Sequence, residues 1–330
     1  MSTPSSQPST SPSGQNLAHR TPATLVPGFT SRPGSARNAL FFLLVIVSIF
    51  VFWKPLRTLV DYSTRGGHQY DHYSHTLLIP FVSLGLVFFE RRKIFKTVQY
   101  SLTIGPALLL VGVLLNWPAL RALLPLGAEE LLSTRILGLV LFWIGGFILC
   151  YGTPAFQAGM FALLFLLLSV PIPGSILDKP LTAVQYGSTE VCSLIFSLSG
   201  VPVFRHGTMF SLPDISVEVA KICSGIHSTL ALFIVSLLAG HLFLSSAWKK
   251  VVLVLFTLPI VCITNGSRIA GLTLLAVYVD PSFMYGSLHR GGGAGFFLAA
   301  TAILLGVLGL LRKGEKKIRQ RGKEISSSGD

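Results

Sequence analysis

The chain of 330 residues is 51% hydrophobic, only 12% charged, and carries a formal net charge of +13. An average soluble domain is roughly 25% charged, so this composition excludes a soluble globular enzyme, a disordered chain and a small disulfide-stapled domain. The composition therefore indicates an integral membrane protein, and the position of its positive charge needs an explanation.

The first 36 residues are rich in Ser, Pro and Thr and have no apolar periodicity, so we predict that 1–36 is a disordered cytosolic tail. Residues 37–312 contain uncharged runs long enough to cross about 30 Å of hydrocarbon, and we predict one transmembrane domain there. The fold class is an all-α polytopic helix bundle of about eight spans, at 38–53, 72–89, 97–120, two within 136–177, 222–248, 251–279 and 294–311. The sequence YGTP at 151–154 supplies the turn inside the longest run.

The least membrane-like segment is 174–221, between the fifth and sixth predicted spans. Its first part has apolar residues at roughly helical spacing with polar residues between them, which predicts an amphipathic helix at the membrane surface. Residues 201–220 alternate β-branched and aromatic side chains around Gly207 and Pro213, which predicts a hairpin or short sheet. We therefore expect a small extracytoplasmic cap at 174–221 that leads directly to Cys223.

The basic residues are unevenly distributed between the two sides of the predicted bundle. A cytosolic N-terminus places 16 basic and 4 acidic residues on the inside, against 9 and 9 on the outside. Lys and Arg concentrate on cytosolic flanks, so we predict that both termini, including the basic tail 313–330, are cytosolic. The positive charge thus reflects topology in a cell membrane; the lipid bilayer is the expected partner of the tail, and no nucleic acid is expected.

Three polar residues within or beside apolar spans are candidates for chemistry, because such groups are costly in a membrane. They are Cys223 in KICSGIHS, Arg268 in ITNGSRIAG and His289 in SLHRGGGAG, and the predicted topology brings all three to the outer face. A helix N-terminus or a nearby cation favours the nucleophilic thiolate of a cysteine. A histidine can take the thiol proton and return it to a leaving amine, and an arginine can stabilise an oxyanion.

Other interpretations of these residues stay open. Arg268 also fits an anion site in a membrane transporter or lipid-flipping bundle, and Cys192 could form a disulfide with Cys223 on the oxidising side. His227, one turn after Cys223, is a rival base to His289. Two further cysteines are expected to be structural: Cys150 and Cys262.

Several motifs follow one another in a set order along the chain. They are YSHTLLIPFVSL at 73–84, TRILG at 134–138, SVPIPG at 169–174, GVPVFRHGTMFSLPDISVEVAKICSGIHS at 200–228, Asn265 to Arg268 as an NxxR pattern, and His289 before a run of glycines. In this order they resemble the exosortase/archaeosortase family of multi-pass membrane cysteine transpeptidase-like proteins, over roughly residues 69–310. Thr76 stands where the family usually has glycine.

The resemblance implies a function and a site. Cys223, Arg268 and His289 match the family's proposed catalytic Cys, Arg and His. Relatives act on secreted proteins that carry a C-terminal tail of a short motif such as Pro-Glu-Pro, a transmembrane helix and a basic cluster, and in Gram-negative bacteria they accompany exopolysaccharide loci. We therefore expect a cysteine peptidase or transpeptidase at the outer face of the inner membrane, which needs no cofactor or metal. The sequence does not indicate an oligomeric state.

Overall fold

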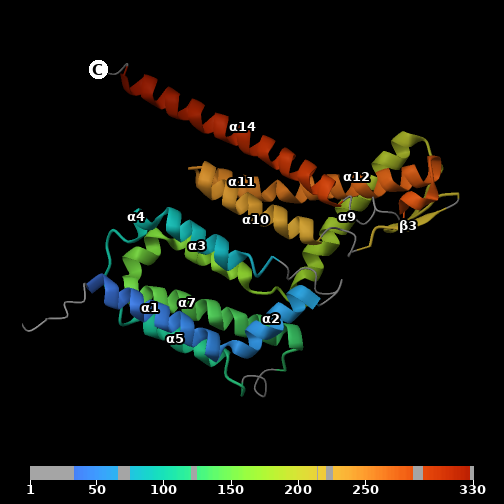
Figure 1. Cartoon of the computed structure of the whole chain (residues 1–330). Coiled ribbons are helices and arrows are strands. Elements are labelled where there is room, and N and C mark those ends of the chain that lie inside the picture. Colours follow the sequence, from blue (N-terminus) through green and yellow to red (C-terminus); the bar gives the residue numbers. More distant parts are fainter. Residues whose placement is uncertain are drawn as a thin grey trace, which may run out of the picture.

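The computed structural model describes residues 33–65, 75–119, 125–213, 215–220, 226–284 and 293–327. Cys223, His289 and most of the predicted N-terminal tail lie outside these ranges. Within them the chain is almost entirely helical and has one small sheet (Figure 1). The predicted all-α membrane helix bundle is confirmed.

The N-terminal half of the chain forms one group of helices, drawn in blue and green in Figure 1. Its elements are α1 (Pro33–Val51), α2 (Trp53–Arg65), α3 (Ile79–Phe89), α4 (Arg91–Ile94), α5 (Ile104–Leu115), α7 (Ala128–Ala158), α8 (Met160–Phe165) and the 3₁₀-helix η3 (Leu166–Ser169). Helices α1 and α5 pack along α7, with Phe52, Leu139 and Phe142 buried between them. Helix α1 begins at Pro33, inside the segment predicted as tail.

Helix α7 contains the predicted turn at 151–154. Gly152 has a φ of 88° and a ψ of 169°, a backbone conformation that only glycine adopts without strain, and Pro154 follows it. Leu166 then packs against Val140 and Ile144, so the chain doubles back on itself. The turn between two helical runs is confirmed.

Helix α9 (Gly174–Ser199) changes direction by 96° relative to the run from Met160 to Ser169. It crosses to a three-stranded antiparallel sheet of β1 (Phe204–His206), β2 (Met209–Ser211) and β3 (Ser216–Glu218), in that spatial order (Figure 1). The inner face of the sheet packs Phe210 and Val219 against α9 and the later helix α12. The helix and the short sheet predicted for 174–221 are confirmed, whereas their side of the membrane stays a prediction.

The C-terminal half forms a second group of helices, in orange and red in Figure 1. Its elements are α10 (Ile226–Phe243), α11 (Ala247–Leu255), α12 (Thr257–Tyr278), the 3₁₀-helix η5 (Pro281–Met284) and α14 (Gly293–Ser327). Helix α14 continues through most of the segment 313–330 that we predicted as a tail, because its Lys, Arg, Glu and Gln are good helix formers. Glu315 on α14 accepts hydrogen bonds from the backbone N–H of Ser245 and Ser246, which ties α14 to the start of α11.

The number of membrane crossings stays a prediction. In the described ranges, three helical stretches are long and apolar enough to cross a membrane: Ala128–Ala158, Ala247–Tyr278 and Gly293–Glu315. The number rises to five if each of two pairs of helices joined at a sharp bend counts as one span. All eight predicted spans coincide with helices, but Ile79–Phe89, Ile104–Leu115 and Ser228–Phe243 are short apolar ones. An 11-residue helix covers only about 16 Å, roughly half of the hydrocarbon thickness.

Candidate active site

Arg268 lies on α12 and lines a cavity of about 20 Å³ between α10, α12 and α14. This volume holds roughly one water molecule. The cavity wall combines polar groups with aromatic rings: Ser228, Thr264, Asn265 and Arg268 beside Phe296 and Phe297. The arginine therefore lies where three helices from the C-terminal half of the chain meet.

Two of these helices begin at the cavity. Ser228 stands in the first turn of α10, and Gly293 is the first residue of α14. A Cβ placed on Gly293 would lie 3.5 Å from Nη1 of Arg268, so the guanidinium contacts the start of α14. A helix N-terminus carries about half a positive charge. Two such ends and a guanidinium all carry positive charge, which suits an anion such as a thiolate or an oxyanion.

Arg268 is the member of the predicted triad that lies in the described ranges. Cys223 and His289 lie outside them, as does the side chain of the rival base His227. However, Ser228 follows Cys223 by five residues and Gly293 follows His289 by four, and both line the Arg268 cavity. An extended chain covers at most about 3.6 Å per residue. The cysteine is thus within roughly 18 Å of Ser228, and the histidine within roughly 14 Å of Gly293.

The NxxR pattern of the sequence has a structural purpose. Nδ2 of Asn265, one turn before Arg268, donates a hydrogen bond to Oγ of Ser188 on α9 across 3.1 Å, and both side chains are buried. At the next residue, Gly266, an added Cβ would lie 2.7 Å from the Ser188 carbonyl oxygen and from the Cβ of Val191. Such a close approach of two helices needs glycine, so Asn265 and Gly266 fix Arg268 relative to α9.

A second contact of α9 holds the strand that leads to Cys223. Nε2 of Gln185 donates a hydrogen bond of 2.7 Å to the carbonyl oxygen of Val219, which is fully buried. Val219 follows β3 and precedes Cys223 by four residues. The sequence interpretation missed Gln185. Its signal was a set of polar residues with helical spacing on one face of α9: Gln185, Ser188 and Thr189.

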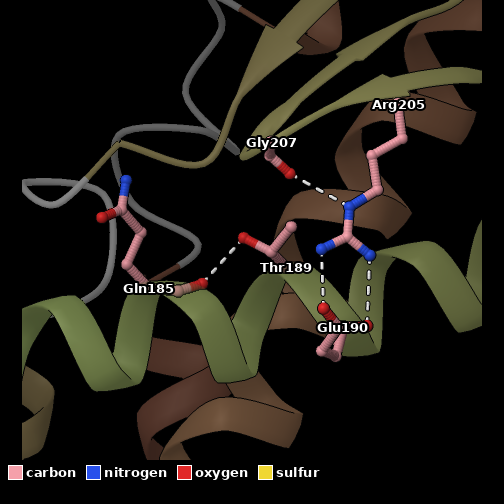
Figure 2. A network of polar contacts seen from close by, with 5 residues as sticks. All are labelled: Gln185, Thr189, Glu190, Arg205 and Gly207. Atoms are coloured by element: carbon pink, nitrogen blue, oxygen red, sulfur yellow. Dashed lines mark hydrogen bonds and ion pairs between the residues drawn. The ribbon is translucent and has the colours of Figure 1, made fainter.

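The sheet is attached to α9 by an ion pair (Figure 2). The guanidinium of Arg205 on β1 forms two hydrogen bonds with the carboxylate of Glu190, of 2.6 and 3.1 Å, and its Nε donates to the Gly207 carbonyl oxygen across 3.0 Å. The carboxylate raises the pKa of Arg205. Figure 2 shows these side chains one turn along α9 from Gln185. Helix α9 therefore positions both the sheet and the arginine helix.

The remaining cysteines behave as structural residues. Cys150 and Cys192 are buried free thiols, and Cys262 is a half-buried one. Sγ of Cys192 donates a hydrogen bond to the Gly266 carbonyl oxygen across 3.2 Å, whereas Cys223, its partner in the alternative disulfide, lies outside the described residues. In the described part of the chain, no group of three or more His, Cys, Asp and Glu side chains is arranged to hold a metal ion.

Comparison with known proteins gives one match. The model of a family described as transmembrane exosortase matches residues 68–306, which is more than two thirds of the chain. Neither the curated proteins nor the solved structures give a match. The matched range begins just before the YSHT motif and includes the Arg268 cavity.

Proposed function

Because the chain belongs to the transmembrane exosortase family, whose members are membrane proteins with a transpeptidase-like role in protein sorting, we propose that it cleaves the C-terminal sorting tails of secreted proteins. Such a tail would consist of a short motif, a transmembrane helix and a basic cluster. The proposed nucleophile is Cys223, with Arg268 as the oxyanion partner and His289 as the base. The reaction takes place at the outer face of a cell membrane, and both termini of the chain are cytosolic.

The proposed reaction has two steps. His289 takes the proton of the Cys223 thiol, and the thiolate attacks the carbonyl carbon between the motif and the anchor. Arg268 donates hydrogen bonds to the oxyanion of the tetrahedral intermediate. The protonated histidine gives its proton to the departing amine, which leaves a thioester between the substrate and Cys223. An acceptor amine or a water molecule then attacks the thioester, releases the sorted protein and restores the thiol.

The observation that carries this proposal is the electropositive cavity at Arg268. It combines a guanidinium with the first turns of α10 and α14, which follow Cys223 and His289 in the sequence by a few residues. Removal of one oxyanion donor costs about 10²- to 10³-fold in kcat in other enzymes. The same positive field would favour the thiolate of an adjacent cysteine over its thiol.

The open edge of β3 is the proposed binding position for the extended sorting motif. The backbone N–H of Val219 donates a hydrogen bond to the Thr208 carbonyl oxygen, and that of Leu212 donates one to the Ile215 carbonyl oxygen. In this register the alternate residues Ser216 and Glu218 direct their N–H and C=O groups away from β2. Both residues are exposed. A peptide that pairs with this edge would be held a few residues from Cys223, as in other cases of β-strand addition.

Proline substitutions test this binding mode. Ser216→Pro and Glu218→Pro remove only an outward N–H and should leave the pairing with β2 intact. We expect KM for a tail peptide to rise with little change in kcat, whereas Ser216→Ala and Glu218→Ala, which keep the N–H, should bind normally. Unchanged KM in both proline variants would exclude strand addition at this edge.

The main test of the proposed function is the processing of a co-expressed protein with a tripartite tail, followed by its size on a blot. Cys223→Ala should abolish processing, and Cys223→Ser should be almost as inactive, since a hydroxyl is a poor nucleophile without a strong base. The matched control Cys150→Ala removes a buried thiol remote from Arg268 and should process normally. Wild-type processing by Cys223→Ala would exclude a cysteine mechanism, and would favour the alternative of a transporter or lipid-flipping bundle with Arg268 as its anion site.

A further inference from the structure

A larger cavity, of about 190 Å³, lies between α2 and the first turns of α7. Pro55, Thr58 and Tyr62 of α2 form one wall, and Ala128, Leu131 and Arg135 of α7 form the opposite wall. At roughly 30 Å³ per water molecule it has room for about six waters. It is therefore large enough for a compact polyatomic ion.

Among the described residues, Arg135 is the one charged side chain that lines this cavity. Its Nε is buried and has no hydrogen-bond partner, and the guanidinium forms no ion pair with the described residues. The two carboxylates in the first turn of α7 form no ion pair with Arg135: Glu129 accepts a hydrogen bond from the backbone N–H of Gly174, and Glu130 accepts one from Oγ of Ser175 and lies beside Gly127 of the cavity wall. A partly buried cation without a carboxylate partner favours the binding of an anion.

The start of helix α7 at the cavity also favours a negatively charged ligand. Ala128 is the first residue of the 31-residue helix α7, whose first backbone N–H groups have no partner within the helix. Lys54 and Arg57 on α2 are exposed and lie outside the cavity lining. Planar, bidentate recognition of phosphate is a common role of arginine.

Two exposed tryptophans give an expectation for the depth of the cavity in the membrane. Helix α2 departs by 72° from the direction of α1, starts with the exposed Trp53, and is amphipathic. Trp117 is exposed at the end of α5, which packs along α7. Tryptophan is enriched at the level of lipid headgroups. We therefore expect the cavity to lie near the membrane interface.

We propose that this cavity is a phosphate-binding site in which Arg135 binds the phosphate group of a lipid headgroup or a free phosphate ion. It is separate from the proposed active site. Gly174 and Ser175 of α9 contact α7 beside the cavity, whereas Ser188, about 20 Å further along α9, contacts the Arg268 helix. The site does not depend on the chemistry proposed for Cys223, because its ligand and its test do not involve cleavage.

The experiment uses the purified full-length chain and two probes. In the first arm, native mass spectrometry measures the retention of phosphatidylglycerol, compared with a phosphate-free diacyl glucolipid of the same acyl chains. In the second arm, thermal unfolding is followed in inorganic phosphate and in chloride at equal ionic strength. The test variants are Arg135→Gln, which removes the charge, and Ala128→Trp, which fills the cavity and keeps the arginine. The matched control is Arg57→Gln, on an exposed position of α2.

We expect Arg135→Gln and Ala128→Trp to raise Kd for the phosphate-bearing probe about 10- to 100-fold, while Arg57→Gln stays within about twofold of wild type. If the two variants lose the retention of phosphatidylglycerol, the ligand is a lipid headgroup. If they lose only the stabilisation by inorganic phosphate, the ligand is the free ion. If both variants bind both probes with the wild-type Kd, the proposed site is wrong. An effect of Arg135→Gln without one of Ala128→Trp would also overturn it, since the charge would then act outside the cavity. If Arg135→Gln does not fold, Ala128→Trp decides the question.

Discussion

The hydrogen bond from Gln185 to Val219 gives a prediction about how the proposed nucleophile, Cys223, is positioned. Gln185→Leu keeps a side chain of similar size but removes the donor, so the buried Val219 carbonyl oxygen loses its 2.7 Å partner. A buried polar group without a partner costs about 1–3 kcal/mol. The carbonyl oxygen can regain a partner in water only if the chain between β3 and Cys223 moves out of its position. This free energy then lowers the fraction of protein in the active arrangement by about 5- to 150-fold.

The assay is the rate of tail cleavage by purified protein, together with elution as a single folded species. We expect a loss of kcat/KM within this range and normal elution. The matched control is Gln157→Leu, the same substitution at an exposed position of α7, which should cleave at the wild-type rate. A folded Gln185→Leu protein with wild-type kcat/KM would show that α9 does not position the nucleophile.

Three other predictions follow from the same structure. Arg268→Lys should lower kcat about 10²- to 10³-fold despite keeping the charge, because an ammonium lacks the planar fork of a guanidinium; a single-turnover assay with less than a tenfold loss would contradict the oxyanion role. Gly266→Ala should lower the unfolding temperature, since its Cβ would lie 2.7 Å from backbone and side-chain atoms of α9. Gly271→Ala on the same helix meets nothing within 4 Å and should keep the wild-type unfolding temperature; equal unfolding temperatures of the two variants would contradict the close α9–α12 packing. A reporter fused after Lys250 should report cytosol and one within 201–213 the exterior; reversed signals would move the proposed site to the other side of the membrane.

The helices and their one sharp turn could be predicted because their signals are local. Uncharged runs mark the helices, and a glycine two residues before Pro154 marks the turn. The short sheet also follows from local alternation around Gly207. The extension of α14 beyond the apolar run was not predicted, because its charged residues were interpreted as a solvated tail although they are also good helix formers.

The site was less predictable because its contacts join distant parts of the chain. Asn265 and Ser188 are separated by 77 residues, and Gln185 and Val219 by 34. No local pattern indicates these pairs. Arg268 was identified as a charge in an apolar span, and its cavity agrees with a functional role. Cys223 and His289 were identified as polar residues beside apolar spans and then matched by motif order, and their roles stay a prediction. Arg135 was counted only as a basic residue near a span end, since its missing partner is visible only in the folded protein.

The contacts of α9 also determine when the site can form during synthesis. Its first residues can dock on α7 as soon as they emerge, because Glu129 and Glu130 are already made. Ser188 must wait for Asn265, which at 5–20 residues per second is a delay of about 4–15 s. The start of α14, which completes the wall of the Arg268 cavity, is inserted later still. If the chain acts as we propose, the nascent protein therefore cannot cleave a sorting tail until α14 has been inserted.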